Sequence, residues 1–243
     1  MSESLHELAL MNELESRVDV IIPAWNEEAA IGRVIADIPE FVRKVWVVDN
    51  GSNDRTGEVA SQAGAQVLHQ PERGYGAACL LGVEQAIASG AKVLVFLDGD
   101  YSDHPEQMTK LLDPIVQGRA DFVVGSRVLG VRTKGSLMPQ QRFGNWLATT
   151  LMRWMYGVAY TDLGPFRAIT ASAYQSLRMQ DRNYGWTIEM QVRAAQCGLR
   201  SEEVPVDYRV RIGQSKVSGT VKGSLRAGYK ILFTLFKLKW KLG

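Results

Sequence analysis

Cysteine is scarce in this sequence, which narrows the chemistry open to the chain. The two cysteines, Cys79 and Cys197, lie far apart, and neither belongs to a C-x-x-C motif or to a cluster of cysteine and histidine. This spacing gives no support for structural zinc or for a disulfide framework. We therefore expect a reduced, cytoplasmic protein.

Long uncharged stretches are also missing. No run of about 18 residues is free of charge, so the sequence predicts no membrane-spanning helix. Residues 1–17 contain four glutamates and one arginine, whereas a signal peptide begins with positive charge. We expect a chain that is not secreted and whose only membrane contact is peripheral, at the inner face.

Acidic residues are absent after Asp207, although nine basic residues follow it. Over residues 221–243, helical spacing places the basic side chains on one side and the apolar ones on the other. Two interpretations remain open for this basic amphipathic helix. Its apolar side packs on the protein, or it contacts an anionic membrane surface. A nucleic-acid partner is not expected, because the rest of the chain is acidic and contains no base-reading module.

Short apolar runs alternate with helical patterns through the first half of the chain. The runs are residues 18–22, 45–48, 66–68, 93–97 and 122–124. This alternation predicts an α/β fold with a single open, mostly parallel sheet and flanking helices. Asn26 is the predicted N-cap of the first helix, and a later strand is predicted over residues 203–211. We expect an N-terminal extension (1–16), one domain (17–220) and the C-terminal helix (221–243).

Polar residues follow each predicted strand. They occupy residues 23–27, 49–54, 73–76, 98–100 and 125–127. Since the carboxyl ends of parallel strands share one edge of a sheet, the five loops should converge on one cleft. The Gly-Tyr-Gly run at 74–76 is not a dinucleotide fingerprint, because Cys79 stands where the last glycine is needed. This argues against a dehydrogenase.

The fourth loop contains Asp98-Gly99-Asp100. Two carboxylates that face one point repel each other unless a cation neutralises them, and Mg²⁺ or Mn²⁺ bound to a nucleoside diphosphate does so. Taken alone, the pair is weak evidence for a metal site, because acidic residues beside glycine are common in solvated turns.

Taken in order, these motifs resemble the family-two glycosyltransferases of the nucleotide-diphospho-sugar transferase (GT-A) fold, especially the polyprenol-phosphate sugar transferases that resemble dolichol-phosphate mannose synthase. The resemblance covers about residues 17–220. It rests on residues 23–28, 48–56, 98–100, 125–127, 161–167 and 211–216.

The resemblance implies a site for a nucleotide-diphosphate sugar donor. The residues implied to bind this donor are Pro23, Ala24, Asn26, Glu27, Asp49, Ser52, Gly74, Asp98, Arg211 and Lys216. Among them, Asp98 would also bind the metal together with Asp100, and Arg211 and Lys216 would close over the diphosphate. The sequence departs from the family at Asn50, where a second acid is usual, and at Ser102, where a glutamine is common.

The acceptor is left open by the residues. A phosphate acceptor needs cationic side chains to bind it, for which Arg127 and Arg142 are the candidates and Arg132 is a weaker third. An alcohol acceptor needs a base to take its proton, a role that Glu189 or Asp162 would serve. The leading hypothesis is a metal-dependent inverting glycosyltransferase that moves a hexose from a UDP- or GDP-sugar to a polyprenyl phosphate or similar membrane lipid. The alternatives are an alcohol acceptor (glycolipid, saccharide or small metabolite) and a non-catalytic sugar-nucleotide-binding protein.

Overall fold

The computed structural model describes residues 17–213 and the helix at 221–240. The predicted N-terminal extension (1–16), Lys216 and the last three residues lie outside the described residues. The strands are β1 (Val18–Ala24), β2 (Lys44–Asp49), β3 (Gln66–His69), β4 (Val93–Phe96), β5 (Phe122–Ser126), β6 (Arg167–Thr170) and β7 (Ser201–Pro205). The helices are α2 (Ile31–Ala36), α3 (Thr56–Gln62), α4 (Tyr75–Ala88), η1 (Pro105–Gln107), α5 (Met108–Val116), α6 (Pro139–Tyr156), α7 (Ala171–Leu177), α8 (Trp186–Gln196) and α9 (Val221–Trp240).

The strands form one open sheet of seven strands in the order β3-β2-β1-β4-β6-β5-β7. All neighbouring pairs are parallel except those that involve β6, which runs antiparallel to both β4 and β5. The predicted mostly parallel sheet is therefore confirmed. The reversal of β6 brings its first residue, Arg167, to the edge where β4 and β5 end, because Arg167 pairs with Phe96 and Val124.

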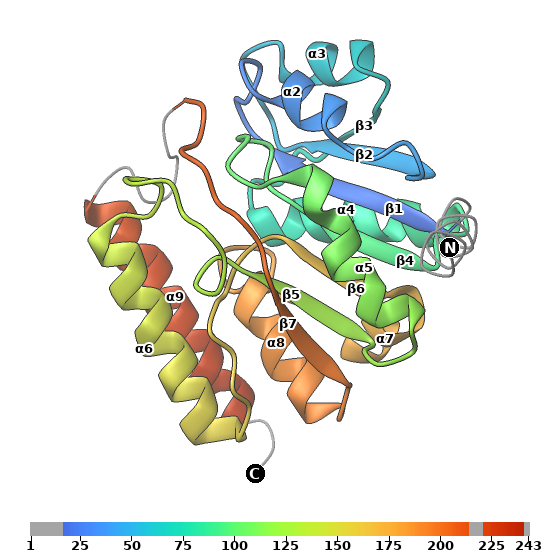
Figure 1. The fold of residues 1–243 in the computed structure, drawn as a ribbon. Helices are drawn as coiled ribbons and strands as arrows, with labels where there is room; N and C mark the ends of the chain where they lie inside the picture. The colour runs from blue at the N-terminus through green and yellow to red at the C-terminus, as the bar shows by residue number, and fades with distance from the viewer. Residues whose placement is uncertain (1–16, 214–220, 241–243) are drawn as a thin grey trace.

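Helices cover both faces of the sheet (Figure 1). One core contains residues of α2, α3 and α5, and the other contains residues of α4, α6, α7, α8 and α9. Strand β4 is buried along its whole length, with Val93 and Val95 in the first core and Leu94 and Phe96 in the second. Burial on both faces explains why this strand is a continuous apolar run in the sequence.

One local prediction is wrong, and another holds only in part. Helix α2 begins at Ile31 with Ala30 as its N-cap, and Asn26 adopts a left-handed backbone conformation (φ 54°). The side-chain oxygen of Asn26 accepts the N–H of Asn53, so it joins two loops and does not cap a helix. The last strand, β7, lies at Ser201–Pro205, earlier than predicted, and the segment after Pro205 is not a strand.

Helix α9 lies beside α6 at one side of the molecule (Figure 1). Leu235 and Leu238 of α9 are buried, and the Tyr156 hydroxyl donates to the carbonyl of Leu235 at 2.6 Å. The apolar side chains of Leu235 and Leu238 thus pack on the protein, as one of the two interpretations predicts. Tyr229 and Phe233 are nevertheless exposed, so α9 also presents aromatic side chains to the outside. Among the described helices, none has the length and apolar character needed to cross a membrane.

Candidate functional site

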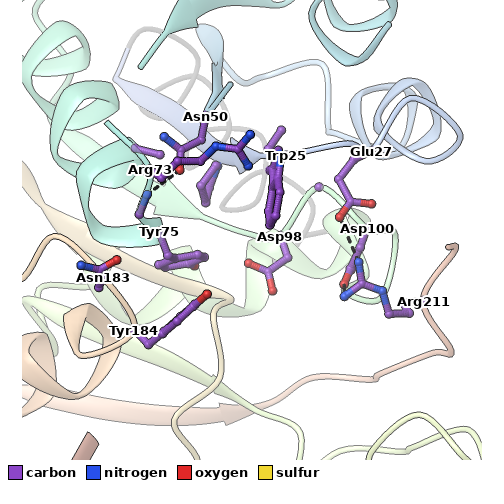
Figure 2. Close-up of a pocket in the computed structure, with 15 residues that line it drawn as sticks. Trp25, Glu27, Asn50, Arg73, Tyr75, Asp98, Asp100, Asn183, Tyr184 and Arg211 are labelled. Atoms are coloured by element: carbon purple, nitrogen blue, oxygen red, sulfur yellow. Dashed lines mark hydrogen bonds and ion pairs between the residues drawn. The ribbon is translucent and has the colours of Figure 1, made fainter. Parts of the chain in front are cut away.

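A pocket opens at the carboxyl edge of the sheet, where the predicted loops meet (Figure 2). It is lined by Pro23, Ala24, Trp25, Glu27, Asn50, Arg73, Gly74, Tyr75, Ala78, Asp98, Gly99, Asp100, Asn183, Tyr184 and Arg211. The loops after β1, β2, β3 and β4 all contribute, so the predicted convergence is confirmed for four of the five loops. The remaining lining residues come from the α7–α8 connection and from the segment after β7.

One end of the pocket holds facing charges. The Arg211 guanidinium lies 3.0 Å from a carboxylate oxygen of Asp100 and 2.9 Å from one of Glu27 (Figure 2). The chain itself therefore supplies a cation against these carboxylates. Asp100 is buried, and its carboxylate also accepts the backbone N–H of Ser102 at 2.9 Å.

A third carboxylate lies beside the predicted acid pair. Asp103 is buried, and its carboxylate accepts the N–H of Asp98 at 3.2 Å. Burial, followed by the charges of Asp100 and Asp103, raises the pKa of Asp98 well above its usual value. Burial and then the charge of Asp100 raise the pKa of Asp103 to about 7. Sequence reasoning missed Asp103, although it stands only three positions after Asp100.

This excess of buried negative charge fits a divalent cation. Carboxylate oxygens are the ligands that Mg²⁺ and Mn²⁺ prefer. Among the described residues, no group of three or more histidine, cysteine or acidic side chains is placed so that it could hold a metal ion by itself. Asp98 and Asp100 could therefore hold a cation whose other ligands come from a diphosphate, as Mg²⁺ sites with few protein ligands often do.

The other end of the pocket is flat and aromatic. The Arg73 guanidinium lies 4.2 Å from the centre of the Trp25 ring, and Tyr184 lies across the pocket (Figure 2). The Asn50 side-chain amide holds the loop after β3 in place. It donates to the carbonyls of Gln70 and Glu72 and accepts the N–H of Gly74. Aromatic and guanidinium faces of this kind favour stacking with a planar ring.

The two glycines at the start of α4 allow a close approach between backbones. Gly74 has a φ of 153°, and a Cβ on Gly74 would overlap the carbonyl of Arg182, as a Cβ on Gly76 would overlap that of Asp181. The N–H of Ala77 donates to the carbonyl of Arg182 at 2.9 Å. These glycines therefore allow the α7–α8 connection to pack against the first turn of α4.

Most of the predicted donor-binding residues line the pocket, but three of them do not. Those that line it are Pro23, Ala24, Glu27, Gly74, Asp98 and Arg211, together with the predicted metal ligand Asp100. Asn26, Asp49 and Ser52 instead join neighbouring loops: Asn26 N–H donates to Ser52 Oγ at 2.9 Å, and Ser52 N–H donates to Asp49 Oδ1 at 2.8 Å. Their described contacts join the loops that follow β1 and β2.

Five of the pocket residues that were not predicted to bind the donor fall into two groups. Trp25, Asn50 and Arg73 stand in the loops already flagged, so the strand-end pattern could have found them. Asn183 and Tyr184 come from the α7–α8 connection, whose sequence gave no strand-end signal.

A second hollow lies beside α6. It is lined by Val128, Arg132, Leu137, Pro139, Arg142, Phe143, Asn145, Trp146, Thr149, Tyr160 and Thr161. Two arginines thus share a largely apolar concave surface. Phe143 and Trp146 are also exposed on the outer face of α6, so apolar surface continues out of the hollow.

Arg127 and Asp162 form a buried ion pair next to this hollow. Two nitrogens of the Arg127 guanidinium lie 2.7 Å from the two Asp162 oxygens, and Asp162 is 1% exposed. Burial raises the pKa of Asp162, but the charge and hydrogen bonds of Arg127 outweigh burial and hold it below its usual value. A carboxylate held in this way is a poor base.

The Glu189 side chain binds the backbone of the α7–α8 connection. Its carboxylate accepts the backbone N–H groups of Gln180 and Asp181 and forms an ion pair with Arg193 at 2.7 Å. Glu189 is buried and lines neither the pocket at the carboxyl edge of the sheet nor the hollow beside α6. This placement argues against the predicted alternative in which Glu189 acts as the base.

Comparison with known proteins gives a consistent picture. Residues 19–178 match the model of the family described as glycosyl transferase family 2. The chain is 34% identical over 226 residues to undecaprenyl-phosphate mannosyltransferase of Micrococcus luteus, covering 85% of this chain and 90% of that protein. It is 35% identical over 211 residues to dolichyl-phosphate hexose transferase of Haloferax volcanii, covering 84% and 88%.

The fold matches a solved structure. Glucosyl-3-phosphoglycerate synthase from Mycobacterium tuberculosis, crystallised with Mn²⁺, UDP-glucose and phosphoglyceric acid, superposes with a TM-score of 0.74 at 22% identity. The match covers 94% of this chain and 83% of that chain. At this identity the likeness is one of fold.

Proposed function

The chain belongs to glycosyltransferase family 2, and we propose that it transfers a hexose from a UDP- or GDP-sugar to a polyprenyl phosphate or a similar lipid-linked phosphate. The observation that carries this proposal is the hollow beside α6, where Arg132 and Arg142 lie among apolar side chains. A lipid phosphate combines an anion with a hydrocarbon chain, and this hollow offers a surface for each. The names of the two relatives agree with such an acceptor.

The donor fits the pocket at the sheet edge. The flat end formed by Trp25, Arg73 and Tyr184 suits a nucleobase, and the acidic end suits a diphosphate that arrives with a cation. Asp98 and Asp100 would hold Mg²⁺ or Mn²⁺, which when bound stabilises the negative charge that develops on the leaving diphosphate. Arg211 would then exchange its contact with Asp100 for the phosphate oxygens, since both are anions within reach of one guanidinium.

The acceptor chemistry requires no base. A phosphate monoester oxygen is already an anion near neutral pH, so it attacks the anomeric carbon directly as the bond from that carbon to the diphosphate breaks. The products are the glycosyl lipid phosphate and the free nucleoside diphosphate. The engagement of Asp162 with Arg127 and of Glu189 with Arg193 accords with this route, because neither carboxylate is placed to take a proton.

We also propose that α6 and α9 meet the surface of a membrane. Both helices expose aromatic side chains, which favour the boundary between water and lipid. The exposed aromatic residues are Phe143, Trp146, Trp154, Tyr229, Phe233 and Phe236. Phe143 and Trp146 also line the hollow beside α6, so a lipid acceptor could enter it from this side.

A substrate panel tests the proposal. The protein is incubated with UDP- and GDP-sugars, Mn²⁺ or Mg²⁺, and either short polyprenyl phosphates or alcohol acceptors of matched chain length, and products are identified by mass spectrometry. Product is expected with a polyprenyl phosphate and not with the matched alcohol. Transfer to the alcohol alone would overturn the phosphate-acceptor proposal, and nucleotide binding without any transfer would indicate a binding protein.

Replacing Arg142 with alanine should raise the KM for the lipid phosphate and leave the KM for the donor unchanged. Hydrogen bonds to charged groups contribute about 1.5–3 kcal/mol, which corresponds to roughly a 10- to 100-fold change. Arg153→Ala is the matched control, because Arg153 is exposed on the same helix and does not line the hollow. Equal effects of the two substitutions on acceptor KM would contradict the assignment.

Mn²⁺ affinity should rise between about pH 6 and pH 8, since carboxyls with raised pKa values must lose their protons to face a cation. The pKa of Asp98 is raised, and that of Asp103 is raised to about 7. Binding in the absence of nucleotide is measured by electron paramagnetic resonance across this range. Asp103→Asn should flatten the profile while leaving Asp98 and Asp100 in place, and an unchanged slope in this variant would contradict the prediction.

A further inference from the structure

The α7–α8 connection, residues 178–185, lies between the donor pocket and the C-terminal helix. On one side, Asn183 and Tyr184 line the pocket (Figure 2). On the other side, Asp181 forms an ion pair with Lys230 of α9 at 2.9 Å. One short segment therefore contacts both the proposed nucleotide site and the last helix of the chain.

The contacts with the pocket side hold the backbone of this segment. The carbonyl of Arg182 accepts the N–H of Ala77 in the first turn of α4 at 2.9 Å. The Arg182 side chain adds an exposed ion pair with Glu72, on the loop after β3. A shift of residues 181–183 would therefore move the wall of the pocket and the support of α4 together.

The contacts with the helix side converge on Asp181. One oxygen of its carboxylate accepts the N–H of Asn183 at 2.8 Å, and the other oxygen faces the Lys230 ammonium. The side chain of Asp181 is 9% exposed and that of Lys230 is 33% exposed, so this pair is more sheltered from solvent than a surface ion pair. Gly185 packs so closely on α9 that a Cβ there would lie 2.5 Å from Thr234 Oγ1.

The same helix carries the exposed aromatic face. Tyr229 is next to Lys230 in the sequence, and its ring stacks on Phe233 with centroids 6.1 Å apart. Side chains at successive positions of a helix point in different directions, so α9 offers Lys230 to the loop and Tyr229 to the outside. A change in the seating of α9 would reach Asp181 through this lysine.

We propose that α9 holds the wall of the donor pocket in place, a role that we call a strut. Lys230 is the positioning residue, and it acts through Asp181 on Asn183 and Tyr184. Nucleotide affinity therefore depends on the docking of the C-terminal helix. The proposal rests on the proposed function only in taking the pocket as the nucleotide site. Without the Lys230 ammonium, the Asp181 carboxylate keeps its bond to the Asn183 N–H but loses its tie to α9. Residues 180–184 then sample positions in which the pocket wall is displaced, and binding must first restore the wall.

The test compares Lys230→Gln with Lys237→Gln, an exposed lysine on the same helix. Lys230→Gln should weaken binding of UDP or GDP in the presence of Mn²⁺ by about tenfold, a typical coupling between two sites. It should also speed amide exchange at residues 180–184. Lys237→Gln should change neither, and Lys230→Arg should restore both, because it returns the positive charge.

Asp181→Asn provides the second arm, since it leaves α9 untouched and keeps an acceptor for the Asn183 N–H. It should reproduce the effect of Lys230→Gln, and the double variant should be no worse than either single variant, because both remove the same contact. Additive effects would overturn the strut. The strut proposal would also be overturned if Lys230→Gln bound nucleotide as tightly as the wild type does. This holds whether or not faster amide exchange across residues 228–240 shows that α9 has undocked.

Failure of the proposed function gives a different result. If the wild-type chain binds neither UDP nor GDP, the nucleotide assignment of the pocket falls. Amide exchange at residues 180–184 still decides whether Lys230 positions the segment: faster exchange in Lys230→Gln and Asp181→Asn, but not in Lys237→Gln, supports the strut, and equal exchange in all of them overturns it.

Discussion

Asp100→Asn is expected to lower the rate of sugar transfer by about 10³-fold, an effect comparable to the loss of one group that stabilises transition-state charge. Asparagine has nearly the shape of aspartate and can still accept the N–H of Ser102, so the loop should keep its form. What it loses is the negative charge that would hold a cation against the leaving diphosphate. The fall should therefore appear mainly in kcat, with little change in the melting temperature.

The measurement is product formation under saturating donor, acceptor and Mn²⁺, together with Mn²⁺ binding. Asp121→Asn is the matched control, because Asp121 forms an exposed ion pair with Arg200 and does not line the pocket. Full activity in Asp100→Asn would remove the metal role from this residue. A fall of equal size in Asp121→Asn would show that the assay reports stability and not chemistry.

Arg127→Ala is expected to lower the free energy of unfolding by about 3–5 kcal/mol, because it leaves a buried carboxylate without its partner. Asp162 is 1% exposed, and both of its oxygens face the Arg127 guanidinium. Chemical denaturation at neutral pH measures the loss. Arg119→Ala is the control: its ion pair with Glu202 is exposed, and such pairs contribute within about 1 kcal/mol.

The pH dependence of this loss follows from the lowered pKa of Asp162. A carboxyl whose folded pKa lies below its unfolded value stabilises the protein above the unfolded value of 3.8, and that contribution is lost as the pH falls through the folded pKa. The difference between wild type and Arg127→Ala should therefore be greatest near neutral pH and shrink in acid. A difference that does not vary with pH would contradict this account.

The ion pair between Arg127 and Asp162 limits which substitutions can test an acceptor site. Activity lost in Arg127→Ala would combine any effect on a phosphate with the damage to the buried pair. Arg142 and Arg132 line the hollow and give a cleaner test, because Arg142 is exposed and Arg132 is half-buried. Glu189→Gln has the same weakness as Arg127→Ala, since Glu189 holds the N–H groups of Gln180 and Asp181.

The strand-end residues were open to prediction because two local patterns fix them. An apolar run of four or five residues identifies a buried strand, and parallel strands end at one edge. This placed Glu27, Asp98 and Asp100 in one pocket correctly. Asn26 and Asp49 stand in the same loops but contact neighbouring loop residues, because a residue in a strand-end loop can turn toward the pocket or toward another loop.

Partners distant in sequence were beyond such patterns. Arg127 contacts Asp162 across 35 positions of the chain. Arg167 lies nearer to Asp162 in the sequence, but its fully buried side chain donates to the carbonyls of Gly164 and Thr187. Guanidinium groups bond to carboxylates and to carbonyls alike, so the residue types alone do not choose among several possible partners.

The sequence by itself determined the α/β class, the strand-end cleft with its acid pair, and the amphipathic C-terminal helix, because each depends on periodicity or on neighbouring residues. Only the tertiary structure decided that β6 is reversed, that Arg211 faces Asp100, and that Lys230 reaches Asp181 beside the pocket. These contacts join segments far apart in the chain. Their formation depends on how the helices and loops pack together, and no local pattern of residues records that packing.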